Sequence, residues 1–254
     1  MNAAMVLAVN TWRQLLRTRF LPVVVLFGGV LVYLGLLLGA LAGDVEPRVL
    51  LDVGMAVVEV MTCGALAYCA ASGVLLEIEQ KTLYLILTRP VPRPAFLLGR
   101  YAGAVAASAT AAAAMTACVA SVLLVKGAPA GTDLLLALWG ALLKGLVTAA
   151  VATLLALVST SVLSAMTMTG VVWVLGHFVA EIRFLAQHTQ SLAAKALLPA
   201  VWLLPDFALL NYRDRLHLPG AGLGESLALG ALYAVLYSAV CLGLTTALFR
   251  RREF

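Results

Sequence analysis

Two ionisable residues, Glu59 and Lys144, stand inside long apolar stretches of this sequence. Counted from the ends of those stretches, both lie about 12–15 Å inside a membrane span at 1.5 Å per residue. A lone charge at such a depth costs at least about 2.5–3.5 kcal/mol on insertion scales. Their similar depth and opposite sign predict an ion pair, within one chain or across a dimer. A role facing a substrate or a water-lined pathway is the alternative.

Other residues whose side chains could bind a metal or take part in catalysis give weaker indications of a functional site. The spacing of His177, His188 and His217 shows no convergence, so a metal site is not expected. Glu181 has neither a nucleophile elbow nor a helical H-E-x-x-H nearby and does not indicate a hydrolase. The four cysteines lie in apolar stretches without a CxxC pair, which indicates small packing residues. They are Cys63, Cys69, Cys118 and Cys241.

The elements that must position these residues are membrane spans. Of the residues, 63% are apolar and 11% are charged, against about 25% charged in a soluble domain. Mean hydropathy is +1.03. A soluble fold would expose large apolar patches, whereas lipid makes this composition reasonable. The net charge of +5 does not indicate nucleic-acid binding, because the basic residues flank apolar runs instead of forming one patch.

The sequence predicts a single all-α domain, 1–254, with six spans, each able to cross a hydrocarbon core of about 30 Å. Residues 3–19 precede them and predict an amphipathic helix in the membrane interface, although these residues could instead begin the first span. Residues 181–223 predict extracytoplasmic interfacial helices, broken at Pro199 and Pro205. The six apolar runs are 21–42, 51–75, 95–125, 134–158, 162–180 and 224–248.

The loop between the second and third spans, 77–94, carries a short apolar stretch from Leu83 to Leu87. A residue before proline is pushed out of the helical region, so a short helix should end near Arg89. Apolar side chains on such a helix need cover, which a groove in a soluble partner would supply. Packing of the helix against its own bundle is the alternative.

This loop and the residues after it resemble the coupling region of ABC-2 type transporter permeases. The resemblance is greatest to the subgroup of the nitrous-oxide-reductase maturation permease. It covers the whole chain, because the amphipathic entry helix and the six predicted spans also resemble that family. Lys81, Pro92 and Arg100 stand where that family commonly has Gly, Ser and Lys. The matching positions are Glu77, Thr82-Leu83, Leu87-Thr88, Pro90, Arg93, Phe96 and Gly99-Arg100.

The resemblance implies a permease subunit of the bacterial inner membrane that dimerises with a second copy or a homologous permease. Two copies of a cytoplasmic ABC ATPase would dock on it and bind the ATP and Mg, and an extracytoplasmic accessory protein is a further possible partner. The chain lacks a G-x-x-x-x-G-K-[ST] loop, so it is not expected to be an enzyme or to hold a cofactor itself.

The resemblance also implies roles for individual residues. The coupling helix would occupy about 82–88, with 3–19 as the connecting helix beside it. Glu77 and Arg93 would fix the loop. The docking residues would be Thr82, Leu83, Tyr84, Leu87 and Arg89.

Two other classes of function remain open. An ATPase-independent secondary transporter or a membrane enzyme would use Glu59, Lys144 and Glu181. A membrane anchor for a cytoplasmic partner is the third possibility. The sequence shows neither inverted repeats nor the substrate.

The distribution of basic residues predicts that both termini are cytoplasmic, because cytoplasmic flanks carry excess Lys and Arg. Reporter fusions after Phe254 and within 77–93 should report cytoplasm, and fusions within 205–220 should report the outside. An extracytoplasmic signal from the C-terminal fusion would overturn the six-span topology. One set of flanks holds Arg13, Arg17, Arg19, Lys81, Arg89, Arg93, Arg100, Arg250, Arg251 and Arg252, and the other holds Arg48, Lys126, Arg183, Lys195, Arg213 and Arg215.

Overall fold

A computed structural model describes residues 3–17, 20–40, 46–79, 93–127, 131–188, 201–212 and 223–251. All regular secondary structure in these ranges is helical, which confirms the all-α fold class. The helices are α1 (Ala3–Arg17), α2 (Phe20–Ala40), α3 (Glu46–Glu79), α5 (Arg93–Val125), α6 (Thr132–Val158), α7 (Val162–His177), α8 (Val179–His188), the 3-10 helix η2 (Phe207–Leu210) and α11 (Leu223–Arg251).

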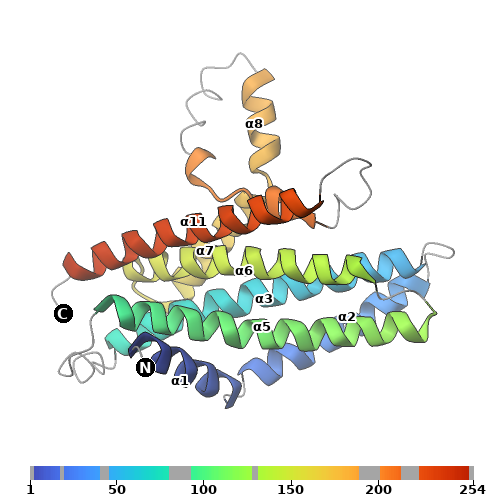
Figure 1. Ribbon diagram of the computed structural model, residues 1–254, viewed down its shortest axis with the longest axis horizontal. Coiled ribbons are helices and arrows are strands. Elements are labelled where there is room, and N and C mark those ends of the chain that lie inside the picture. The colour runs from blue at the N-terminus through green and yellow to red at the C-terminus, as the bar shows by residue number, and fades with distance from the viewer. Residues whose placement is uncertain are drawn as a thin grey trace.

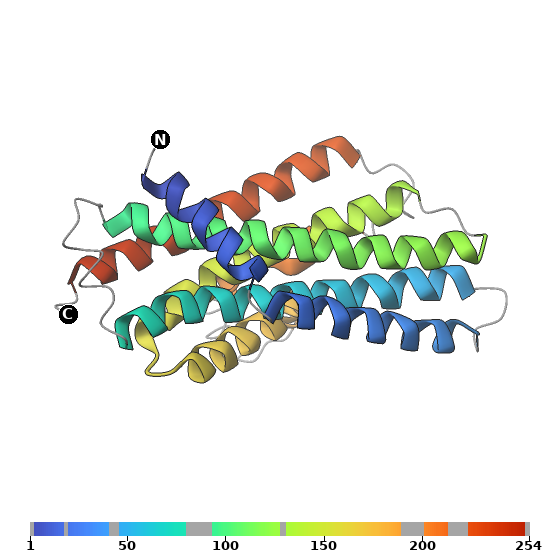
Figure 2. The ribbon, with the colours of Figure 1, turned by 90° about the horizontal axis from the view of Figure 1, so that it is seen from below.

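The longest helices run side by side in one bundle, and α8 projects away from its axis (Figure 1). Helix α1 lies obliquely across α5, as the view from below shows (Figure 2). Both chain ends lie at one end of the bundle, together with the ends of α3 and α5 that flank residues 80–92. We call this the termini end.

Among the described residues, four helices are long and apolar enough to cross a membrane, within α3, α5, α6 and α11. They correspond to four of the six predicted spans. A fifth candidate consists of α7 and α8 together. Helix α2 has 21 residues and occupies the position of the first predicted span, although part of its side chains lies outside the described residues. The total of six spans therefore stays a prediction.

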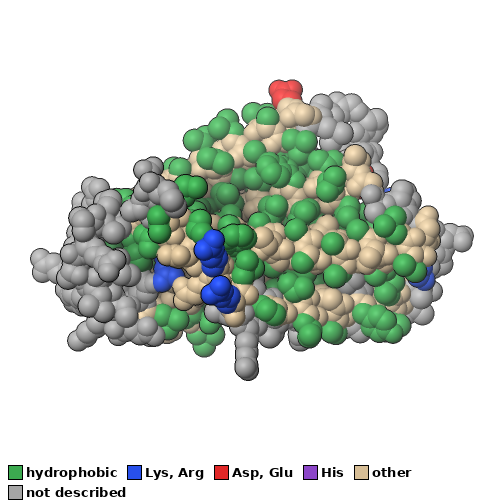
Figure 3. Space-filling view, turned by 60° about the horizontal axis from the view of Figure 1, so that its bottom comes forward, with side chains coloured by type: hydrophobic (Ala, Val, Ile, Leu, Met, Phe, Trp, Pro, Cys, Tyr) green, Lys and Arg blue, Asp and Glu red, His purple; other side chains and the backbone are tan. Residues whose placement is uncertain are grey.

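Apolar side chains are spread over the whole described surface of the bundle on the face shown in Figure 3, and basic side chains lie mainly in the half toward the termini end, with another at the opposite end. Exposed Leu26, Leu135, Leu163 and Val240 lie on four different helices. Such a surface is unfavourable in water over a large area and favourable against lipid chains. The helical bundle thus has the surface of a membrane protein.

The fifth span differs from the prediction of a continuous run over 162–180. Helix α7 ends at His177, and α8 leaves it at an angle of 56°. The 16 residues of α7 extend about 24 Å, less than the hydrocarbon thickness. A straight continuation would have carried Glu181 and Arg183 further along the bundle, whereas α8 projects away from its axis (Figure 1).

Residues 201–212 pack against the bundle, and their predicted extracytoplasmic position stays a prediction. Phe207, Leu210 and Tyr212 are buried. Two glycines permit this approach, because a Cβ at Gly140 would lie 2.6 Å from the Leu210 carbonyl oxygen and one at Gly176 would lie 2.7 Å from that of Pro205. The segment therefore packs its backbone directly against α6 and α7.

A salt bridge holds the beginning of this segment to α8. Arg183 Nη1 lies 3.1 Å from Asp206 Oδ2, and the Arg183 guanidinium lies over the Trp202 ring at 5.1 Å from its centroid. The second carboxylate oxygen of Asp206 accepts the backbone N–H of Ala208 at 3.2 Å and caps η2. One buried carboxylate thus fixes both α8 and η2.

In helix α1, Arg13, Gln14 and Arg17 are exposed and Thr11 is buried, whereas Met5 and Leu16 of the predicted apolar face are also exposed. Helix α1 is still only predicted to lie in a membrane interface. It packs closely on α5, because a Cβ added at Gly103 would lie 2.6 Å from the Ala8 carbonyl oxygen and 2.5 Å from the Thr11 Cβ. Small residues at such contacts let two backbones approach.

We expect Gly103→Ala to destabilise the protein by about 1–3 kcal/mol, because the methyl group would overlap the α1 backbone. Gly73→Ala is the matched control, since a Cβ there meets no atom within 4 Å. Replacing glycine by alanine inside a helix then stabilises by up to about 1 kcal/mol. Thermal unfolding in detergent should show opposite shifts for the two variants. Equal upward shifts would contradict the close packing of α1 on α5.

Candidate functional site

The predicted ion pair forms within one chain. Lys144 Nζ donates to Glu59 Oε1 at 2.8 Å, and the two side chains are 2% and 9% exposed. Lys144 lies near the middle of the 27-residue α6, which places the pair near mid-depth of a membrane-crossing helix. Each charge supplies the partner that the other needs in a medium without water.

Close packing of α3 on α6 brings these two residues together. Gly145, next to Lys144, leaves room for Leu66 of α3, whose Cδ1 would lie 2.7 Å from an added Cβ. Buried alanines Ala67, Ala70 and Ala149 continue the contact between the helices. The short side chains let α6 approach until the lysine stem reaches the carboxylate.

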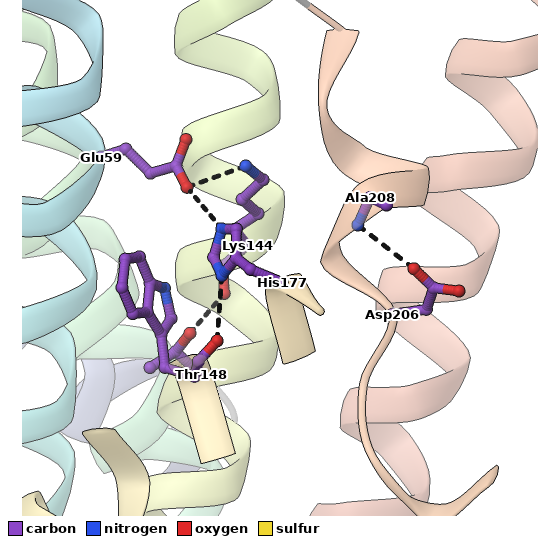
Figure 4. A network of polar contacts seen from close by, with 7 residues as sticks. Glu59, Lys144, Thr148, His177, Asp206 and Ala208 are labelled. Atoms are coloured by element: carbon purple, nitrogen blue, oxygen red, sulfur yellow. Dashed lines mark hydrogen bonds and ion pairs between the residues drawn. The ribbon is translucent and has the colours of Figure 1, made fainter. Parts of the chain in front are cut away.

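His177 joins the pair from the last turn of α7. Its Nε2 lies 3.1 Å from Glu59 Oε1, and its Nδ1 lies 2.9 Å from the Trp173 carbonyl oxygen (Figure 4). We call Glu59, Lys144 and His177 the polar cluster. The sequence did not indicate this third member, because 118 residues separate it from Glu59. Its position as a histidine within an apolar run was the one available signal.

The hydrogen-bond geometry of His177 determines where protons must lie. A carbonyl oxygen only accepts, so Nδ1 carries a hydrogen toward Trp173. The contact between Nε2 and Glu59 Oε1 needs a second proton, on the imidazole or on the carboxyl group. The C-terminal end of α7 favours a cation at this place. The polar cluster thus brings two basic side chains to one carboxylate.

A pocket of about 230 Å³ lies between α3, α6 and α7, one helical turn from the polar cluster toward the termini end. Cys63, Thr148 and Trp173 line it. Each of these residues lies four positions from a member of the polar cluster, on the same helix. Gly64, Thr169 and Gly170 complete much of the wall. The pocket is therefore an apolar space that adjoins the polar cluster.

The polar cluster and this pocket can hold an amphipathic molecule or exchange a proton. Among the described residues, no three His, Cys, Asp or Glu side chains are grouped as metal ligands. Three of the cysteines, Cys63, Cys69 and Cys241, are buried as packing residues, and Cys118 is exposed.

The structure does not bring the other predicted site residues to this cluster. Glu77 lies in the last turn of α3, and Arg93 begins α5. Glu181 is exposed on α8, and His188 at the end of that helix bonds only to the Phe184 carbonyl oxygen among the contacts described. The docking residues and His217 lie outside the described residues, namely Thr82, Leu83, Tyr84, Leu87, Arg89 and His217.

No protein-family model matches the chain, and no curated protein matches it. The residues and their geometry therefore have to indicate the function.

The polar cluster predicts a coupled response to substitution. Glu59→Gln and Lys144→Met should each lower the free energy of unfolding by about 3 kcal/mol, because each leaves a buried partner unpaired. The double variant should recover about 1 kcal/mol relative to the sum of the two losses. Thermal or denaturant unfolding in detergent measures this coupling.

Ser108→Ala is a suitable control, because the Ser108 hydroxyl is buried without a hydrogen-bond partner among the described residues. It should leave the free energy of unfolding near the wild-type value. Strictly additive losses for Glu59 and Lys144 would show that the two residues do not stabilise each other.

Proposed function

We propose that the chain is a transmembrane subunit of an ABC-2 type transporter, working as a dimer with two cytoplasmic ATPase subunits to export or extract a substrate. The resemblance of residues 77–100 to the coupling region of that family carries the proposal. The subunit would lie in the bacterial inner membrane, with both termini in the cytoplasm.

The contacts of Gly99 and Arg100 support this assignment. Both belong to the resembling pattern, and both meet α1. A Cβ at Gly99 would lie 2.9 Å from the Ala4 carbonyl oxygen, and Arg100 Nη1 donates to Gln14 Oε1 at 3.4 Å. The end of the coupling region is therefore attached to the amphipathic helix, as expected for a connecting helix that moves with the loop.

The arrangement of helices at the termini end supports the same mechanism. Helices α3 and α5 flank residues 80–92 and run the length of the bundle (Figure 1). Buried Phe96 and Leu97, at the start of α5, pack in the same apolar cluster as Val74 and Leu75, near the end of α3. A force applied to the loop by closing ATPase subunits would therefore reach both spans together. The ATPase partner would supply the bound ATP and Mg.

A second candidate is an ATPase-independent transporter that uses the polar cluster. The observation that favours it is the break between α7 and α8, which falls at His177 and places a helix end beside two charged residues. Interrupted helices near mid-depth form substrate and ion sites in secondary transporters. The polar cluster would then bind the coupling ion or proton.

The docking proposal predicts that Leu83→Ala combined with Tyr84→Ala releases the ATPase. Such apolar anchors are worth about 1–4 kcal/mol together, so ATPase activity copurifying with the tagged chain should fall at least fivefold. Melting of the isolated subunit should stay near the wild-type value, and added salt should restore little binding. The measurement pairs a pull-down from the native host, with mass spectrometry for a P-loop polypeptide, and a melting curve.

Leu185→Ala combined with Leu203→Ala provides the control, because both side chains are exposed, in α8 and in 201–212. It should retain the ATPase. If the variant with Leu83→Ala and Tyr84→Ala unfolds as an isolated subunit yet keeps the ATPase, these two side chains pack inside the subunit and do not dock the ATPase. A purified chain that transports without a P-loop partner, driven by a pH gradient, would favour the second candidate.

A further inference from the structure

The pocket between α3, α6 and α7 opens on a lateral apolar surface of the bundle. Gly64 of α3 and Gly170 of α7 are exposed at its wall. Val60 and Val174, beside the mouth, are about half exposed. In a membrane-spanning bundle such a surface meets the acyl chains of lipids. An apolar chain can therefore enter the pocket sideways without crossing water.

The size of the pocket suits part of such a chain. A dry cavity of about 150 Å³ is enough to bind benzene, and this pocket holds about 230 Å³. Thr148 and Thr169 turn their hydroxyl groups to carbonyl oxygens of their own helices, at 2.8 Å and 2.7 Å. Their methyl groups are thus left to line the pocket, so the wall of the pocket offers apolar contact.

The polar cluster, which lies one helical turn beyond the pocket, is suited to an anion. The polar cluster carries two basic groups on one carboxylate, and the His177 side chain is 29% exposed. The indole N–H of Trp173 points to the weakly accepting Cys63 thiol, and no nitrogen or oxygen of the described residues accepts from it. A buried donor without a strong acceptor, next to two basic side chains, favours an anionic oxygen of a ligand.

We propose that this pocket binds an anionic amphiphile from the bilayer, with its apolar chain between α3, α6 and α7 and its anionic group toward His177. The site belongs to the isolated subunit and does not depend on an ATPase. It therefore extends beyond the proposed function and can fail or succeed separately from it.

The test uses 9,10-dibromostearate as the probe, because bromine quenches indole fluorescence on contact. Titration of the purified full chain in detergent should quench part of the tryptophan fluorescence saturably. Trp173→Phe should remove that part and leave the signal of the other three tryptophans, since the chain has four. Absence of a saturable component, or its persistence without Trp173, would overturn the proposal.

Two glycines allow the pocket to be filled without distorting the bundle. A Cβ at Gly64 or Gly170 meets no atom within 4 Å, so leucine there should occupy the pocket and preserve melting. Gly64→Leu and Gly170→Leu should each weaken probe binding at least tenfold. Gly243→Leu is the control, because Gly243 lies on α11 with equally open surroundings. Wild-type affinity in both pocket variants would place the probe elsewhere and overturn the site.

A comparison of the acid with its methyl ester tests whether the ligand must carry a negative charge. Methyl 9,10-dibromostearate has the same chain without the charge and should bind wild type at least tenfold more weakly. His177→Gln should bring the acid and the ester within about twofold of each other. Equal binding of acid and ester to wild type would overturn the anionic part of the proposal. A tenfold preference retained in His177→Gln would overturn the placement of the anionic group.

Discussion

The ion pair between Glu59 and Lys144 is the constraint on which the rest of the bundle depends. At mid-depth neither charge can turn to water, so the two helices have little freedom to slide or rotate. A shift of one residue turns a helix by about 100° and would separate the two groups. His177 extends the constraint to α7, because its ring reaches Glu59 only from the last turn of that helix. The register of three helices is therefore set by one carboxylate.

Glycine and alanine make that register sterically possible. Gly145 admits Leu66 between α6 and α3, and Gly103 admits α1 against α5. In lipid, apolar side chains gain little from leaving one apolar surface for another, so close contact and polar bonds hold the helices. Small residues therefore appear where backbones meet, and many large apolar side chains face outward. This division explains how an exposed apolar surface coexists with a specific fold.

The sequence could predict the features that depend on one helix at a time. Apolar length located the spans of α3, α5, α6 and α11, and the isolation of Glu59 and Lys144 indicated their pairing. The break at His177 could not be predicted this way, because no proline marks it and the run over 162–180 stays apolar. Burial of 207–212 and formation of the pocket depend on how three helices pack. Spacing along one chain carries no such information.

The separation of Glu59 and Lys144 along the chain, 85 residues, has a consequence for biosynthesis. At about 5–20 residues per second, α3 emerges from the ribosome roughly 4–17 s before α6. During that interval the carboxylate has no lysine to meet. It must stay protonated, remain near the polar channel of the insertion machinery, or sit close to the lipid head groups until α6 arrives. Assembly of this bundle is thus ordered in time, because α3 can pair its carboxylate only after Lys144 of α6 has been synthesised.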